Sequence, residues 1–210
     1  MNKSIDKINI PTQEEFLKGI EEFEKREKRD AMYKVATFII SYYWGKPSDM
    51  ANGLGVLLLT WNQAFYRYGS FDFDKLERCI DINLKELEYF RNRHITSLSN
   101  SDEKDIIDLF KEFLKALQID SGKIQGRTSP VAVSKALHLL APKFFPIWDQ
   151  KIAKAYGYGY YKSPEMKYFS FCRIIKTIAN KVEGYIDHSD KTLIKLIDEY
   201  NFSKYTGGWI

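Results

Sequence analysis

The chain has 210 residues and a mass of 24.6 kDa, which is the size of one ordinary domain or slightly more. Its residues are 44% hydrophobic, 29% charged and 15% aromatic, with only 6 prolines and 12 glycines, a composition that excludes a disordered chain. Two cysteines, Cys79 and Cys172, are too few for a disulfide framework, a four-cysteine iron-sulfur cluster or a cysteine-based zinc finger. We expect both to be reduced, buried thiols.

The net charge of +4 is unevenly distributed along the chain. Residues 123–181 hold eleven basic side chains against two acids, a local charge of +9 that leaves −5 for the remainder. Such a distribution of charge is typical of a protein that binds a polyanion on one face. The alternative is a general excess of lysine that serves no binding partner.

Residues 1–10 lack a basic segment followed by an apolar one, and no apolar run approaches the length that a membrane-spanning helix needs. We therefore expect a cytoplasmic protein with no membrane association.

Helical periodicity runs through nearly the whole chain, and no stretch alternates with period two, so the sequence predicts an all-α fold. We expect a single domain over 1–210. A charged N-terminal helix over 12–30 should pack on a core of residues 31–210, and Thr12 and Glu15 should form the capping box that begins this helix. Gly45, Pro47 and Gly53 are expected to break the chain before a buried helix. The further helices are expected over 32–44, 54–67, 76–87, 130–140, 149–156, 164–182 and 193–200. One more helix is expected after a capping box of Asn100 and Glu103, with a core face from Ile106 to Leu117.

Three features of the basic segment carry candidate chemistry. The turn Gly126-Arg127-Thr128-Ser129-Pro130 can cap a helix whose free N–H groups and Arg127 would bind a phosphate, although it is also an ordinary helix start. Lys135 lies on that mostly apolar helix, so it either extends to solvent or sits at a pocket rim with a lowered pKa, where it could act as an amine nucleophile. Asp149 follows five apolar residues, and it is either a helix N-cap, a carboxylate in a water-poor site, or both.

The order of these features resembles the helix-hairpin-helix DNA glycosylase superfamily. In that comparison residues 126–140 match the second helix of the hairpin, residues 141–148 the Gly/Pro-rich loop, and Asp149 the catalytic aspartate, while Lys135 falls near the Schiff-base lysine of bifunctional members. Asn62 and Gln63, after an apolar helix, correspond to side chains that fill the gap left by a flipped nucleotide. The resemblance covers residues 54–181 and implies a glycosylase-like bundle of about 8–10 helices.

The chain departs from the family pattern in three places. It lacks the Leu-Pro-Gly-Val-Gly run of the hairpin, its interval from Lys135 to Asp149 is shorter than in well-known members, and it has no cysteine cluster. The last departure excludes the iron-sulfur branch and makes the archaeal 8-oxoguanine glycosylases, or other divergent members, the more similar group.

Aromatic residues near these features are candidates for a base pocket. Tyr156 and Tyr160 flank glycines in a loop that could approach and stack on an extruded base, or could pack on its own domain. We also assign Trp61, Trp148 and the C-terminal Trp209 to this pocket, and Lys151 and Lys154 to the DNA-binding surface together with Arg127, Thr128 and Ser129. The three histidines fall on different elements and no phosphate-binding glycine loop is present, so we expect no metal and no organic cofactor.

The predicted function is therefore a monomeric DNA glycosylase that flips a base out of double-stranded DNA and cleaves its N-glycosidic bond. Asp149 would stabilise the oxocarbenium ion or activate water, and Lys135 would attack C1′ if the enzyme is also a lyase. Oxidised purine is one substrate, for a role in repair, and a hypermodified cytosine of phage DNA is another, for a role in defence. The alternatives are a non-catalytic helical nucleic-acid-binding module and a phage-defence interaction protein that uses the acidic N-terminal helix.

Overall fold

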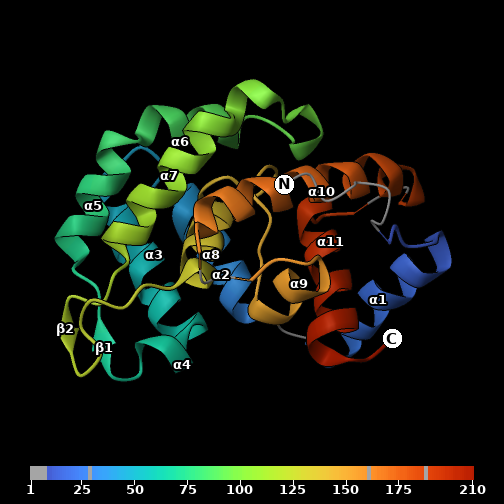
Figure 1. The fold of residues 1–210 in the computed structure, drawn as a ribbon, viewed down its shortest axis with the longest axis horizontal. Helices are drawn as coiled ribbons and strands as arrows, with labels where there is room; N and C mark the ends of the chain where they lie inside the picture. Colours follow the sequence, from blue (N-terminus) through green and yellow to red (C-terminus); the bar gives the residue numbers. More distant parts are fainter. Residues whose placement is uncertain (1–8, 28–29, 160–161, 187–188) are drawn as a thin grey trace.

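The computed structural model describes residues 9–27, 30–159, 162–186 and 189–210, and it is almost entirely helical there (Figure 1). The all-α prediction is confirmed. Among the described residues the α-helices are α1 (Gln13–Arg26), α2 (Ala31–Tyr42), α3 (Pro47–Trp61), α4 (Gln63–Tyr66), α5 (Phe73–Ile82), α6 (Leu84–Arg91), α7 (Glu103–Ala116), α8 (Pro130–Leu140), α9 (Gln150–Ala155), α10 (Pro164–Val182) and α11 (Leu193–Asn201). Short turns of other helix types are η2 (Ile95–Ser97), η3 (Asn100–Asp102), η4 (Glu183–Tyr185) and the π-helix η5 (Phe202–Gly207).

The N-terminal helix is shorter than the predicted 12–30, because α1 ends at Arg26. Thr12 caps it by accepting a hydrogen bond from the Glu15 backbone N–H, which is one half of the predicted capping box, whereas the Glu15 carboxylate pairs with Lys204. Its apolar face, with Phe16 and Phe23 buried, packs against α11 and η5 at the opposite end of the chain. Helix α1 thus lies beside the last two elements of the chain at one side of the molecule (Figure 1).

Gly53 does not break the chain, contrary to prediction. Pro47 occupies the first position of α3, and the helix continues through Gly53 and Gly55 to Trp61. A Cβ at Gly53 would collide with the side chain of Ile39, and one at Gly55 with the ring of Phe73. Both glycines therefore allow α2 and α5 to approach α3 closely, which outweighs their low helix propensity.

Two short strands, β1 (Gly69–Ser70) and β2 (Ser121–Gly122), form an antiparallel pair that the sequence did not predict. They are two residues long, which is too short for a period-two pattern to appear. The start of α7 also differs from prediction, since the capping box is formed by Ser99 and Asp102 around η3, one residue before the predicted Asn100 and Glu103.

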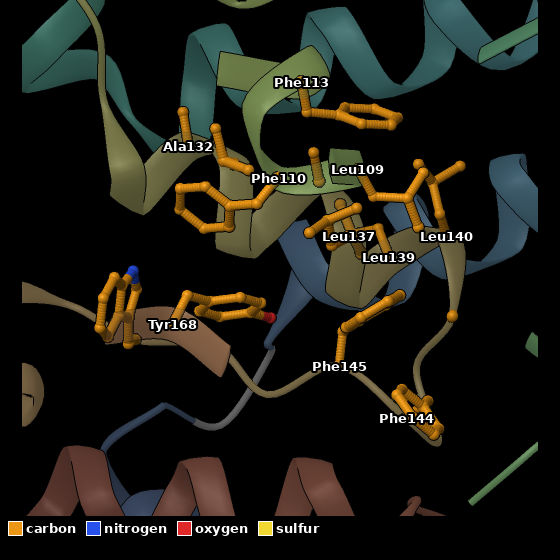
Figure 2. Packing of buried hydrophobic residues seen from close by; sticks show 14 of the residues in the cluster. Leu109, Phe110, Phe113, Ala132, Leu137, Leu139, Leu140, Phe144, Phe145 and Tyr168 are labelled. Carbon is orange, nitrogen blue, oxygen red and sulfur yellow. The ribbon is translucent and has the colours of Figure 1, made fainter. Parts of the chain in front are cut away.

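Helix α8 lies at the centre of the molecule, between α3, α5, α6 and α7 on one side and α9, α10 and α11 on the other (Figure 1). Residues Ala132 to Leu140 of α8 are all buried except Lys135. Figure 2 shows the aromatic side chains that close around them, with Phe110 of α7 over Tyr168 of α10 and Phe144 and Phe145 below the leucines of α8. Cys79 and Cys172 are free and buried, as expected.

Candidate active site

The start of α8 is the first part of the candidate site. Ser129 is the N-cap, and its Oγ accepts hydrogen bonds from the Ala132 backbone N–H and from the Asn62 side-chain amide, both at 3.2 Å. Asn62 follows the last residue of α3, so this bond ties the end of α3 to the start of α8. Arg127 and Thr128 are exposed beside the cap, and Gln63 is exposed at the start of α4. Asn62 thus reaches the turn proposed to bind phosphate, whereas Gln63 faces solvent.

Lys135 is held at the end of α3 and is only partly exposed to solvent. Its Nζ donates a hydrogen bond of 2.9 Å to the backbone carbonyl of Trp61, the last residue of α3, and lies 4.6 Å from the centre of the Trp61 ring. The lysine therefore satisfies a carbonyl that has no partner within its own helix. Burial lowers the Lys135 pKa from 10.5 to about 8, and the carboxylates of Asp198 and Asp149 oppose this change.

Asp149 is the N-cap of α9, as predicted. Its Oδ1 accepts a hydrogen bond of 2.7 Å from the Ile152 backbone N–H, and its Oδ2 accepts one from the Thr206 hydroxyl of η5. The carboxylate is half-buried, so it combines the two roles that the sequence left open. Both of its oxygens have a donor, so the carboxylate is held in one orientation.

Hydrogen bonds between α8 and the loop before α9 bring Asp149 to the Lys135 helix. The Trp148 indole N–H donates to the carbonyl of Pro130 at 3.3 Å, and the Ser134 hydroxyl donates to the Trp148 carbonyl at 3.2 Å. The cap of α8 and the cap of α9 consequently lie on neighbouring chain segments. The loop is attached to α8 by these bonds, which supply partners for backbone groups of both segments.

A second group of charged side chains, which the sequence analysis missed, comes from α11. Lys195 is buried and contacts three carboxylates, with Nζ 3.0 Å from Asp30 Oδ2, 3.6 Å from Glu199 Oε1 and 3.8 Å from Asp198 Oδ2. Burial raises the Asp198 pKa from 3.8 to about 6, against the effect of Lys195. All residues from Ile194 to Asn201 of α11 are buried, because α1, α10 and η5 pack around the helix.

His138 lies one turn after Lys135 on α8 and is fully buried. Its Nδ1 is 2.7 Å from the carbonyl of Phe145, and its ring packs against that of Tyr33. Its Nε2 has no hydrogen-bond partner among the residues that the structure describes. Burial lowers the His138 pKa from 6.5 to about 4, and the charge of Lys195 adds to this effect. His138 is thus neutral near pH 7, and no local pattern in the sequence distinguishes it from an ordinary core residue.

The residues assigned to a base pocket are spread over several places. Trp61 contacts Lys135, but Trp148 has no exposed surface and packs with Tyr168 and Phe171, so a base could stack on it only by displacing them. The remaining residues are distributed as follows: Tyr156 donates its hydroxyl to Asn201, Trp209 packs on Phe202 and Arg26, and Tyr160 lies outside the described residues.

The basic segment is mostly solvated. Eight of its eleven basic side chains are exposed, among them Lys151 and Lys154, and Lys151 also donates a hydrogen bond to the carbonyl of Thr206.

A pocket of about 400 Å³ lies elsewhere, between η2, η4 and the start of α11, and does not include Lys135 or Asp149 in its lining. The part of the chain described by the structure contains no cluster of metal-binding side chains and no helix that could span a membrane.

Comparison of the chain with models of protein families, with curated proteins and with solved structures finds no match in any of the three.

Proposed function

We propose that the protein is a DNA N-glycosylase with a fold similar to that of the helix-hairpin-helix glycosylases, in which Lys135 is the nucleophile and Asp149 the fixed anion. The observation that carries this proposal is the environment of Lys135. A half-buried amine with a pKa of about 8, subject to the charges of Asp149 and Asp198, suits nucleophilic catalysis near neutral pH better than a solvated lysine does.

The reaction uses the neutral form of the Lys135 amine. Its lone pair attacks C1′ of the nucleotide, and the bond from C1′ to the base breaks with its electron pair going to the base, which then takes a proton. Transfer of a proton from the bound nitrogen to the ring oxygen opens the sugar and leaves an imine between Lys135 and C1′. The Asp149 carboxylate stabilises the positive charge that develops on the sugar as the bond to the base lengthens.

Exposed groups around the two helix caps supply the contacts with double-stranded DNA. Arg127 and Thr128 are exposed beside the N-terminus of α8, and Lys151 and Lys154 are exposed on α9 after Asp149, so these side chains can contact phosphates. Asn62 and Gln63 follow α3 at the same end as Trp61, which fits the role of filling a gap in the duplex. Oxidised purine and hypermodified cytosine remain the two substrate classes.

The test uses duplexes that carry 8-oxoguanine, uracil, an alkylated base or glucosylated hydroxymethylcytosine. Cleavage is read on denaturing gels with and without hot alkali, and the imine is trapped covalently with borohydride. We expect alkali-dependent strand breaks with one substrate class and a trapped complex. Lys135→Gln should abolish the complex, and Asp149→Asn should slow excision by about 10²-fold or more, while asparagine preserves the helix cap.

Matched controls come from an exposed ion pair on α7. Lys104 Nζ lies 3.2 Å from Asp108 Oδ2, with the lysine 84% exposed, so Lys104→Gln and Asp108→Asn make the same chemical changes away from the site. Both controls should retain full excision. Excision that survives both Lys135→Gln and Asp149→Asn would contradict the mechanism.

A non-catalytic nucleic-acid-binding module is the second candidate, favoured by the eight exposed basic side chains. It predicts no strand breaks on any duplex, together with binding that weakens steeply as salt concentration rises. Binding alone does not separate the two candidates, because Asp149→Asn removes a negative charge near phosphate and tightens binding in either case.

A further inference from the structure

We propose that the protein forms a two-fold symmetric homodimer through an apolar surface made by α2 and α3. This surface, the α2–α3 face, consists of five exposed side chains: Met32, Val35, Phe38 and Tyr42 of α2 and Val56 of α3. The inference goes beyond the proposed function and does not depend on it. It also differs from the monomer that the sequence led us to expect.

Exposed apolar side chains are concentrated on these two helices. Among the described residues, ten large apolar side chains are exposed, and five of them belong to the α2–α3 face. The other five are distributed over α1, the residue before β1, α5, α6 and α10: Leu17, Tyr68, Ile82, Tyr89 and Met166. Single exposed apolar residues are ordinary on a protein surface, whereas a contiguous group marks an interaction site.

The five side chains form one continuous surface because α2 and α3 are antiparallel neighbours. The four positions on α2 follow at intervals of three or four residues, so they share one face of that helix. The Thr60 hydroxyl of α3 donates a hydrogen bond of 3.4 Å to Met32 Sδ, and a Cβ at Gly53 of α3 would collide with the side chain of Ile39. Val56 lies between Gly53 and Thr60 on α3, and therefore beside the middle of the row on α2.

The two helices carry very little charge. Helix α2 has 12 residues and α3 has 15, and each contains one charged residue, Lys34 and Asp49, in a chain of which 29% is charged. A nucleic acid would need several basic side chains for its phosphates, and an anionic membrane surface would need them along the polar edge of the helix. The α2–α3 face is therefore suited to the surface of a protein.

A second copy of the chain is the protein that this face fits. In a two-fold symmetric dimer the same surface meets itself, so any charge on it would oppose a like charge. None of the five side chains is charged, and homodimer interfaces are more apolar than interfaces with transient partners. Phe38 and Tyr42 stack with their ring centres 6.0 Å apart, and such aromatic side chains act as the central anchors of protein interfaces.

The exposed area of the face meets the requirement of a dimer. Phe38 and Tyr42 are 68% and 69% exposed, and the other three side chains are about half exposed. Together they offer roughly 500 Å² on each copy, or about 1,000 Å² in a pair, which is the size at which specific interfaces begin. Exposed polar residues of the same helices would supply a rim: Ser41, Asn52 and Thr60.

The test measures the mass of the protein by sedimentation equilibrium over a range of concentrations, without DNA. We expect the mass to rise with concentration from 24.6 kDa to twice that value. The dimer should persist at about 0.5 M salt, because the burial of apolar surface is not screened by ions. Phe38→Glu places a carboxylate in the interface on both copies, so it should raise the dissociation constant by at least about 10²-fold.

Two methionines provide a matched pair of variants. Met32 and Met166 both lie in the first turn of a helix and are 44% and 46% exposed, but Met166 is on α10 and outside the α2–α3 face. Met32→Glu should weaken the dimer about tenfold, and Met166→Glu should leave its dissociation constant unchanged. Circular dichroism shows whether each variant keeps its helices, so that loss of the dimer is not confused with unfolding.

Four results would overturn the inference. The first is a wild type that remains at 24.6 kDa up to about 100 μM, a concentration at which even a weak dimer would form. The second is a Phe38→Glu variant that dimerises as the wild type does, and the third is an equal effect of Met32→Glu and Met166→Glu. The fourth is dissociation at about 0.5 M salt, which would indicate that the basic and acidic surfaces hold the copies together.

Discussion

Two buried aspartates in this protein, Asp102 and Asp198, are held in opposite ways. Asp102 accepts two hydrogen bonds from the Arg93 guanidinium, at 2.7 and 2.9 Å, and a third from the Ser99 backbone N–H at 2.7 Å. Among the described residues Asp198 has one ion-pair partner, Lys195 at 3.8 Å, which it shares with two other carboxylates. Both side chains are nearly inaccessible to water, but their partners differ.

The consequence appears in the pKa values of the two carboxyls. For Asp102, burial favours the neutral acid, but the Arg93 and Ser99 hydrogen bonds outweigh it and the pKa is lowered. For Asp198, burial prevails over Lys195 and the pKa is raised to about 6. A carboxylate with complete partners stabilises a fold, whereas one with incomplete partners is able to exchange a proton near neutral pH.

The largest effect that would test this comparison is expected at Asp102. Asp102→Ala leaves the Arg93 guanidinium, only 17% exposed, without its partner and removes the cap of η3. We expect a loss of about 3–5 kcal/mol of unfolding free energy, measured by urea denaturation at pH 7. Asp198→Asn removes a charge that burial disfavours, so its loss should be below about 1 kcal/mol. Equal losses at the two positions would refute the distinction between them.

The pH dependence of stability gives the next effect, because His138 and Asp198 act in opposite directions. The His138 pKa falls from 6.5 unfolded to about 4 folded, so its contribution is present above pH 6.5 and is lost as pH falls toward 4. The Asp198 pKa rises from 3.8 to about 6, so its contribution is present below pH 3.8 and is lost as pH rises toward 6. Each shift corresponds to about 3 kcal/mol, and the wild type should vary little between pH 4 and 6.

Two variants separate these opposing contributions. In Asp198→Asn the midpoint of urea unfolding should fall as pH is lowered from 6.5 to 4, because only His138 remains. In His138→Gln, where the amide can still donate to the Phe145 carbonyl, the midpoint should instead fall as pH is raised from 4 to 6. If the unfolding midpoint of the wild type already changed with pH as strongly as that of either variant, one of the two pKa shifts, of His138 or of Asp198, would be absent.

The sequence predicted those parts of the site that depend on local patterns. Ser129, Pro130 and Asp149 have positions that follow from capping preferences, and α8 is observed over the same residues as predicted. The class of fold followed in the same way from helical periodicity. These features are properties of consecutive residues, so a single chain is enough to identify them.

The missed features depend on which helices meet in space. Gly53 has a low helix propensity, but the approach of Ile39 from α2 makes glycine necessary inside α3. Asp198 and Lys195 occupy positions that on a partly exposed helix would face solvent, and only the packing of α11 on all sides buries them. The contact of Lys135 with Trp61 spans 74 residues, a separation over which no periodicity carries information.

The smallest predicted effect concerns the caps that hold the site together. Ser129 caps α8 while buried and also accepts from Asn62, whereas Thr12 caps α1 in an exposed position. Ser129→Ala removes two hydrogen bonds from a place that water does not reach, so we expect a loss of about 2 kcal/mol, against about 0.5–1 kcal/mol for Thr12→Ala. Thermal unfolding of both variants measures the difference.

Because Asn62 adjoins Trp61, whose carbonyl binds Lys135, Ser129→Ala should also change the pH profile of Lys135 acetylation by acetic anhydride, read by mass spectrometry, and Thr12→Ala should not. If Ser129→Ala lowered the stability without changing the pH profile of Lys135 acetylation, the end of α3 would be held in place without Ser129.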